Sequence, residues 1–224
     1  MPPRVRTLAI VGAGPAGLTL AAILAREAPN AWKVSVFERS AVDCDQGSGW
    51  DLNQPAQAAL TRAGVDVKDV QRAGSDTMRF FRAGESTPSL CIRWPDLLTP
   101  FLNKSFFMDA ANQETERGRI IAQLIAAARG SDVSITHNVK VCGLRSEASG
   151  SVSLLGDGAR PLGTFDAVVD ASGTAAILRR ERFTPASDAF FTERIIVQGV
   201  VYDPEASWDP ALVSHLGEGT LGKY

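Results

Sequence analysis

Three glycines directly after a short apolar segment constrain the fold of this chain more than any other feature. Residues 8–11 (Leu-Ala-Ile-Val) form a continuous apolar run, which is typical of a strand buried on both faces of a parallel sheet. Gly12, Gly14 and Gly17 follow with the spacing G-x-G-x-x-G, and a helical pattern covers residues 15–27. The sequence therefore predicts a strand, a tight turn and a helix.

The turn between this strand and the helix has the properties of an anion-binding site. Gly12 allows the tight turn, Gly14 lets the backbone approach a pyrophosphate, and Gly17 lets the helix pack closely on the strand. The free N–H groups of the first helical turn and the positive end of the helix dipole favour a negative charge there. Pro15 suits the first helical turn, because N–H groups there have no partner within the helix and the missing N–H of proline costs nothing. The loop expected to bind the pyrophosphate of a dinucleotide comprises Gly12, Ala13, Gly14, Pro15, Ala16 and Gly17.

A second predicted strand, residues 33–37, ends in Glu38, where a dinucleotide-binding sequence requires an acid to accept hydrogen bonds from a ribose. Glu38 lies somewhat beyond the usual spacing of about 20 residues, and a longer loop at residues 28–32 accounts for this. Strand, glycines, helix, strand and acid in this order favour dinucleotide binding over a glycine-rich turn without a ligand. Glu38 and the adjacent Arg39 are therefore candidate cofactor-binding residues.

Composition excludes several classes of function. The chain has 224 residues, 45% of them hydrophobic, enough for one large domain or one and a half ordinary ones. A formal net charge of −2 provides no basic surface for a nucleic acid. The three widely spaced cysteines include no C-x-x-C pair, which argues against disulfides and zinc and favours a reducing compartment. No segment has the apolar length of a membrane span, so a cytoplasmic protein is predicted.

The segment after Glu38 resembles a known family. Residues 43–49 are predicted to form a loop, and a helix over residues 56–63 follows, with Asn53 as its N-cap. The pattern G-x-G-x-D-L-N-x-x-A at residues 47–56, after a dinucleotide-binding segment, is similar to that of FAD-dependent aromatic-hydroxylase-type (group A) monooxygenases. The resemblance implies that this loop passes close to the flavin. Taken alone, the segment is equally compatible with an ordinary loop before a helix.

From residue 77 the pattern changes from helices and buried strands to a hairpin and an irregular segment. Residues 78–82 and 90–94 predict a hairpin, and residues 95–114 are irregular. The resemblance implies an excursion into the substrate-binding layer here, and a covering hairpin with a disordered loop is the alternative. Residues 117–128 then have apolar side chains at the spacing of a helix packed on a sheet. The family carries an arginine at the start of this helix that contacts the phosphate and ribitol of FAD. Arg117 matches it, and the neighbouring Arg119 or a solvated arginine without this role are the alternatives.

Several further strands are expected. Residues 133–137 predict a third parallel strand that continues at residues 139–141, where the resemblance implies that backbone near Val141 contacts the adenine. Residues 152–155 and 161–165 predict a hairpin, and residues 165–170 predict another buried strand. In the family, an Asp-Gly pair follows this strand, with an arginine six positions beyond the glycine. Gly173 and Arg179 match this pattern, but Ser172 occupies the place of the aspartate. This difference weakens the assignment to the hydroxylase family more than it weakens the fold prediction.

Together these features predict an α/β fold: an FAD-binding Rossmann-like βαβ sheet with an interposed β-rich substrate layer, incomplete at the C-terminus. The expected boundaries are 1–76 and 105–182 for the FAD-binding domain, and 77–104 and 183–224 for a partial substrate-binding layer, in which residues 195–202 resemble its first crossing strand. The family's late Gly-Asp motif is missing. The resemblance therefore covers nearly the whole chain but only about half of the family's fold, and a truncated chain is expected.

The resemblance implies a flavoprotein monooxygenase in which NAD(P)H reduces FAD and one oxygen atom of O2 passes to a small organic substrate. The cofactor carries such chemistry, which agrees with the lack of an evident nucleophile, general base or metal site. Two alternatives stay open: an FAD-dependent reductase of the geranylgeranyl-reductase type, which tolerates Ser172 better, and an inactive nucleotide-binding fragment. A simple NAD-binding Rossmann protein is disfavoured by the hairpin after residue 76. The sequence does not specify the substrate, the choice between NADH and NADPH, or the oligomeric state.

Overall fold

The computed structural model describes residues 4–42, 49–74, 77–82, 85, 87–93, 113–129, 132–175, 177–182, 190–193, 204–211 and 220–223. The chain divides into two compact units, each described separately below. The first unit contains residues 1–46, 59–66 and 118–196. The second contains residues 47–58, 67–117 and 197–224.

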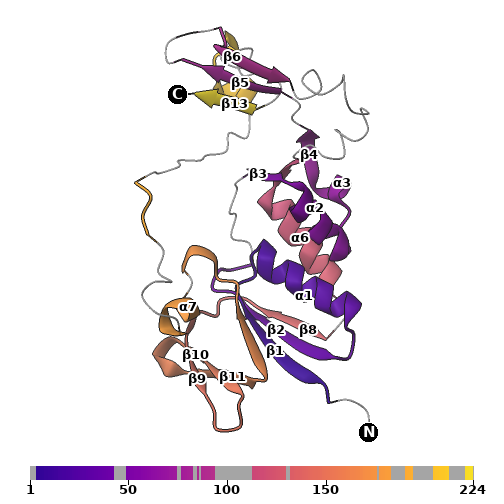
Figure 1. The fold of residues 1–224 in the computed structure, drawn as a ribbon, viewed down its shortest axis with the longest axis vertical. Helices are drawn as coiled ribbons and strands as arrows, with labels where there is room; N and C mark the ends of the chain where they lie inside the picture. The colour runs from indigo at the N-terminus through magenta and orange to yellow at the C-terminus, as the bar shows by residue number, and fades with distance from the viewer. Residues whose placement is uncertain are drawn as a thin grey trace. The chain divides into compact units, whose positions relative to one another are not determined.

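A four-stranded parallel sheet forms the centre of the first unit (Figure 1). Strand β1 (Arg6–Val11) pairs with β2 (Trp32–Phe37) on one side and with β12 (Ala167–Asp170) on the other. Strand β8 (Val133–Thr136) pairs with the outer side of β2 and gives the order β12-β1-β2-β8. The predicted first, second and third parallel strands are therefore confirmed. The side chains from Leu8 to Val11 are buried, as expected for a strand covered on both faces.

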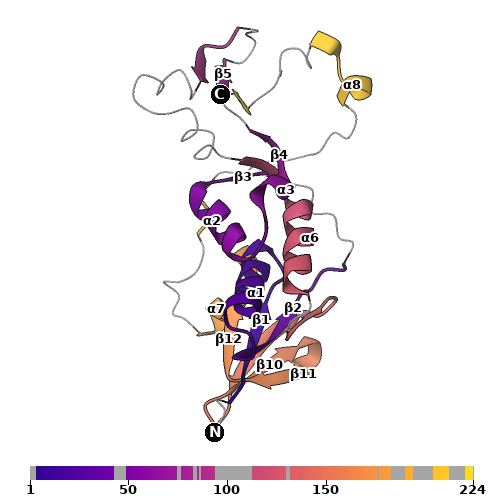
Figure 2. The same cartoon turned by 90° about the vertical axis from the view of Figure 1, so that its right-hand side faces the viewer.

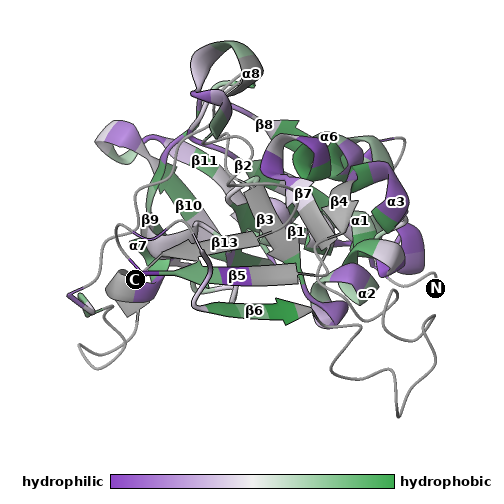
Figure 3. Cartoon of the chain, turned by 90° about the horizontal axis from the view of Figure 1, so that it is seen from above, coloured by the Kyte–Doolittle hydropathy of each residue, from purple (hydrophilic) through white to green (hydrophobic). Residues whose placement is uncertain are grey.

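Helices cover one face of this sheet (Figure 2). Helix α1 (Pro15–Glu27) contacts β1 and β2 and buries Leu18, Ala21 and Ala22. Helix α6 (Arg117–Ala128) buries Ile120, Leu124 and Ala128, and apolar and polar positions alternate around it in Figure 3. Both helices occupy the ranges predicted from the sequence. The helix predicted over residues 56–63 is present as α2 (Gln54–Arg62), and its predicted N-cap is confirmed, because the N–H of Ala56 donates to Oδ1 of Asn53 at 3.1 Å.

A three-stranded antiparallel sheet packs against the parallel one. It contains β9 (Val141–Ser146), β10 (Val152–Gly156) and β11 (Pro161–Phe165) in the order β11-β10-β9. The rings of Phe37 and Phe165 meet edge to face between the two sheets, with their centroids 5.9 Å apart. Helix α7 (Ile177–Arg182) follows β12 and adds Leu178 to the same apolar cluster.

Two sequence predictions for the first unit were wrong in detail. Residues 139–141 do not continue β8, because Asn138 has a φ of +57°, which ends the strand, and Val141 begins β9 in the other sheet. Phe165 belongs to β11 and not to the strand predicted over residues 165–170. Strand β12 is half-buried instead of fully buried, since among the described strands only β1 pairs with it.

The second unit consists mainly of short antiparallel strands. One sheet has the order β3-β7-β4, with β3 (Gly49–Leu52), β7 (Gln113–Glu116) and β4 (Gln71–Gly74). The predicted hairpin is present as β5 (Thr77–Phe81) and β6 (Leu90–Arg93), with β13 (Thr220–Lys223) parallel to β5. Short helices α3 (Val67–Val70) and α8 (Pro204–Ser207) complete this unit.

The irregular segment predicted at residues 95–114 ends sooner than expected, because Gln113 and Glu114 pair in β7. The rest of that segment that precedes residue 113, nearly all of the loop at 43–49 and the strand predicted at 195–202 lie outside the described residues. Within the described part of the chain, none of the helices combines the length and apolar character needed to cross a membrane.

Candidate functional site

The carboxyl ends of β1, β2 and β12 meet around Gly12. The N–H of Gly12 donates to the carbonyl oxygen of Phe37 at 2.8 Å, and the N–H of Ala171 donates to that of Val11 at 2.8 Å. The chain runs from β1 outward to β2 and β8 and then returns to β12 on the other side of β1. Such a reversal of strand order marks the crevice where open α/β sheets bind their ligands. The predicted glycine loop lies at this point.

Close backbone packing explains two of the three glycines. Gly12 has a φ of +108°, and a Cβ atom there would lie 2.5 Å from the carbonyl oxygen of Ala171. A Cβ atom on Gly17 would collide with the carbonyl oxygen of Gly12 and approach the Cβ atom of Ala171 to 3.3 Å. Both positions therefore require glycine for the turn and for the close contact of α1 with the sheet.

The N-terminus of α1 is suited to an anion. Gly14 is the N-cap residue in an extended conformation, and its carbonyl oxygen accepts the first helical hydrogen bond, from the N–H of Leu18 at 3.0 Å. The amides before Leu18 have no partner within the helix, and the helix dipole is positive at this end. The first turn contains no acidic residue, and no side chain caps it. A pyrophosphate at this end would meet backbone N–H groups of the first helical turn, which itself carries no carboxylate.

Glu38 joins the glycine loop to the end of β2. Its Oε2 accepts a hydrogen bond from the N–H of Ala13 at 2.8 Å, and its Oε1 accepts one from the N–H of Ser40 at 2.8 Å. Burial raises the pKa of the Glu38 carboxyl, but the hydrogen bonds from Ser40 and Ala13 outweigh this effect and the pKa lies below its ordinary value. Glu38 is therefore ionised at neutral pH. A carboxylate has about four acceptor positions, which leaves room for ribose hydroxyl groups.

The chain between β8 and β9 runs beside Glu38. The N–H of Glu38 donates to the carbonyl oxygen of Thr136 at 2.9 Å, and the N–H of Val139 donates to that of Glu38 at 2.8 Å. These bonds bring the start of β9 to the end of β2. The side chain of Val141 is buried in the apolar cluster, so only its backbone is a candidate ligand contact. Arg39 is exposed next to Glu38.

Arg117 is the first residue of α6 and directly follows β7. It belongs to the second unit, whereas the glycine loop belongs to the first. Its expected role as a phosphate contact stays a prediction.

Sequence reasoning missed several polar groups near the ends of these strands. The clearest is Asp170, the last residue of β12, whose carboxylate bonds to the turn that follows it. Among the described residues, Nδ1 of His137 and Nε of Arg179 are buried atoms without a hydrogen-bond partner. His137 lies in the segment beside Glu38, and Arg179, which the sequence matched to the family's arginine, lies in α7 after the turn that follows β12. For Asp170 and His137, the position at or directly after the end of a parallel strand was the sequence signal that could have identified them.

In the part of the chain that the structure describes, no group of three or more His, Cys, Asp or Glu residues is arranged to hold a metal ion. A cavity of about 400 Å³ lies at the amino ends of β2 and β8, with Trp32, Val133 and Asp132 in its lining. It is at the end of the sheet opposite to Glu38 and is not part of the crevice.

Comparison with known proteins agrees with this geometry. A family model for FAD-NAD(P)-binding proteins matches residues 9–81, which include the glycine loop and Glu38. A search of curated protein sequences gave no match.

Similar solved structures include 2,6-dihydroxypyridine-3-hydroxylase from Arthrobacter nicotinovorans, with 20% identity and a TM-score of 0.60 over 80% of this chain and 40% of that one. PqsL from Pseudomonas aeruginosa, described as a probable FAD-dependent monooxygenase, has 14% identity and a TM-score of 0.58 over 80% and 45%. CtdE in complex with FAD has 19% identity and a TM-score of 0.56 over 80% and 41%.

The chain thus spans about two fifths of the length of the structures it matches. At these identities, the likeness establishes the fold. Its parallel sheet, its strand order and the family match agree with one another: the chain has the fold of these hydroxylase and monooxygenase structures, and residues 9–81 match the model of FAD-NAD(P)-binding proteins.

Proposed function

We propose that this chain is the FAD-binding part of an FAD-dependent monooxygenase that hydroxylates a small organic substrate with NAD(P)H and O2. The observation that carries the proposal is the crevice at the switch point of the parallel sheet, where the glycine loop and the Glu38 carboxylate are held together by the Ala13 amide. The names of the similar structures support the choice of reaction, since they include a hydroxylase and a probable FAD-dependent monooxygenase.

The residues present fit the adenosine diphosphate portion of FAD. The loop from Gly12 to Gly17 offers the pyrophosphate the positive end of α1 and the amides of its first turn, since the amides of Gly12 and Ala13 bond to Phe37 and Glu38. Glu38 is an ionised acceptor for the ribose hydroxyls at the end of β2. The buried Nδ1 of His137 and Nε of Arg179, both without protein partners among the described residues, support the presence of a polar ligand at these strand ends.

Each part of the chain has a separate task in this proposal. The glycine loop binds the pyrophosphate, Glu38 and Arg39 hold the ribose, backbone at Val141 lies against the adenine, and the Arg117 guanidinium contacts the central phosphates. When bound, FAD supplies the redox chemistry between NAD(P)H and O2. The protein orients the cofactor and excludes water from the reacting atoms.

The proposed division of labour follows the boundaries expected from the sequence. Residues 1–76 and 105–182 bind FAD, and residues 77–104 and 183–224 contribute to the layer that covers the substrate. Within residues 77–104, the antiparallel pairing of β5 with β6 supports the proposal of a β-rich layer.

The first experiment is the visible absorbance of the 224-residue chain after incubation with FAD and gel filtration. Flavin absorbance that elutes with the protein at about one equivalent supports the proposal. A folded, colourless protein that binds neither FAD nor ADP would overturn it. A colourless protein that binds ADP would overturn the flavin assignment for this chain and leave the inactive nucleotide-binding fragment as its function.

Two substitutions locate the binding site within the chain. Gly14→Val should abolish ADP binding, because its side chain blocks the approach of the pyrophosphate, with helical content near that of the unmodified chain. Glu38→Ala should weaken ADP binding by about 1–3 kcal/mol, the range for a lost hydrogen bond to a charged group. The matched control is Glu147→Ala, which removes a carboxylate after the far end of β9 and should leave ADP affinity unchanged. Equal ADP affinity in all three variants would place the site elsewhere.

A further inference from the structure

The carboxylate of Asp170 organises the turn that follows β12. Its Oδ1 accepts hydrogen bonds from the backbone N–H of Ser172 at 3.0 Å and from the hydroxyl group of Ser172. Its Oδ2 accepts hydrogen bonds from the N–H groups of Leu178 and Arg179, each at 3.2 Å. One exposed side chain therefore connects the end of the strand, the turn and the first turn of α7.

This turn is also a wall of the crevice. The N–H of Ala171 donates to the carbonyl oxygen of Val11, the last residue of β1. A Cβ atom on Gly12 would lie 2.5 Å from the carbonyl oxygen of Ala171 and 3.1 Å from Cα of Ser172. The backbone of the turn thus packs directly on the backbone of the glycine loop. A shift of the turn by a few tenths of an ångström would change the space around Gly12.

We infer that Asp170 is a positioning residue for the dinucleotide site: by fixing Ser172 and the start of α7, it holds the Ala171 backbone against Gly12 and sets the geometry of the glycine loop. The identity of the ligand in this inference rests on the proposed function. The effect of Asp170 on the conformation of the glycine loop does not. Asp170 acts through the turn and does not itself need to contact the ligand. The resemblance places an aspartate at position 172, where this chain has Ser172, whose N–H and hydroxyl groups both bond to Asp170.

A purely structural role for Asp170 would have a different consequence. If Asp170 only capped α7, its removal would lower the stability of the protein without altering the glycine loop. The chain provides a matched control, because Asp166 lies immediately before β12 and Asp170 is its last residue. Asp166 bonds to Thr7 near the start of β1, at the end of the strands opposite to the glycine loop.

The test compares Asp170→Ala, Asp170→Asn and Asp166→Ala in the full 224-residue chain. Amide NMR spectra report the environment of Gly12 and Gly14, calorimetric titration with ADP reports affinity, and urea unfolding reports stability. We expect Asp170→Ala to shift the resonances of Gly12 and Gly14 and to weaken ADP binding about tenfold, at the lower end of the effect for residues that orient a site through another group. Asp166→Ala should lower the urea midpoint and leave both resonances and ADP affinity unchanged.

Asp170→Asn should give an intermediate ADP affinity, since its single carbonyl oxygen can serve Ser172 or α7 but not both. This variant also carries the test if Asp170→Ala does not fold. The inference is overturned if the folded Asp170 variants lower stability but leave the Gly12 and Gly14 resonances and the ADP affinity unchanged. Failure of the unmodified chain to bind ADP would contradict the proposed function, and the glycine resonances would then decide the positioning role alone.

Discussion

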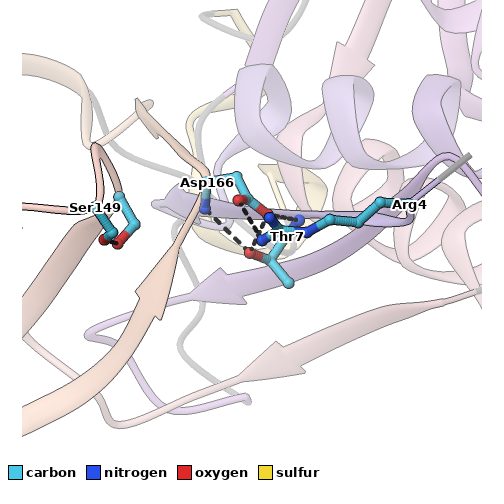
Figure 4. Close-up of polar contacts among 5 residues, drawn as sticks. Arg4, Thr7, Ser149 and Asp166 are labelled. Carbon is cyan, nitrogen blue, oxygen red and sulfur yellow. Dashed lines mark hydrogen bonds and ion pairs between the residues drawn. The ribbon is translucent and has the colours of Figure 1, made fainter.

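Thr7 and Asp166 hydrogen-bond to each other in both directions, although 159 positions separate them in the sequence (Figure 4). The N–H and hydroxyl groups of Thr7 donate to Oδ2 of Asp166 at 2.8 and 2.9 Å, and the N–H of Asp166 donates to Oγ1 of Thr7 at 3.0 Å. Arg4 lies 2.9 Å from the other carboxylate oxygen. These contacts fix the start of β1 to the corner between β11 and β12.

The Thr7–Asp166 contact should make stability depend on pH. Hydrogen bonds from the backbone and then the side chain of Thr7 lower the pKa of Asp166. A carboxyl whose pKa is lower in the folded state stabilises the fold above its unfolded-state pKa of about 4, and this contribution is lost as the pH falls through the folded-state value. Asp166→Asn should therefore lower the urea midpoint at pH 7 more than at pH 3. A difference of the same size at both values would contradict this account.

Gly12→Ala should destabilise the chain more than an alanine at another left-handed glycine. Gly12 has a φ of +108° and a Cβ position 2.5 Å from the Ala171 carbonyl oxygen, whereas Gly150 has a φ of +83° and nothing within 4 Å of its Cβ position. Gly150→Ala isolates the backbone strain, which costs about 1–2 kcal/mol. Gly12→Ala adds a collision between backbone groups, and its free energy of unfolding should fall by at least about 1 kcal/mol more. Urea unfolding of the two variants measures the difference, and equal losses would show that the contact with Ala171 relaxes freely.

The sequence was most informative where local rules determine structure. The range of α1, the glycine turn, the strand ending before Glu38 and the N-cap at Asn53 depend on residues close together in the chain, and all were predicted. The parallel strands themselves were also predicted, because buried apolar runs that alternate with helices are typical of a parallel sheet, but their order in the sheet was not.

Non-local pairing was harder to predict. The left-handed Asn138 sends the chain from the parallel sheet into β9, and one residue in this conformation leaves little signal in the sequence. The bonds of Asp170 to Leu178 and Arg179 cross a turn whose path depends on the packing of Ala171 against Gly12. The hydrogen bond from the Ala13 amide to the Glu38 carboxylate was likewise not predicted. The two groups come within reach only when β1 and β2 are aligned side by side.

The Glu38 carboxylate should make the glycine loop sensitive to acid. Burial raises its pKa, but the hydrogen bonds from Ser40 and Ala13 leave the net value lowered. Its stabilising effect is therefore complete above the unfolded-state pKa of about 4.3 and is lost as the pH falls through the folded-state pKa. The stability difference between the unmodified chain and Glu38→Gln should shrink between pH 6 and pH 3. Urea unfolding across this range tests the prediction. A constant difference would show that the Ala13 bond does not depend on ionisation.

Phe37 and Phe165 should be energetically coupled, because they link the parallel sheet to the antiparallel one. Their rings meet at 75° with centroids 5.9 Å apart, and both side chains are buried. Edge-to-face pairs contribute about 0.5–1.5 kcal/mol beyond their buried area. A double-mutant cycle with Phe37→Leu and Phe165→Leu should give a coupling energy in this range from urea unfolding. Phe191→Leu, at a side chain that is 70% exposed, is the control and should change stability by less than about 0.5 kcal/mol. Strictly additive effects of the two core substitutions would mean that the sheets are joined by general apolar packing and not by this ring pair.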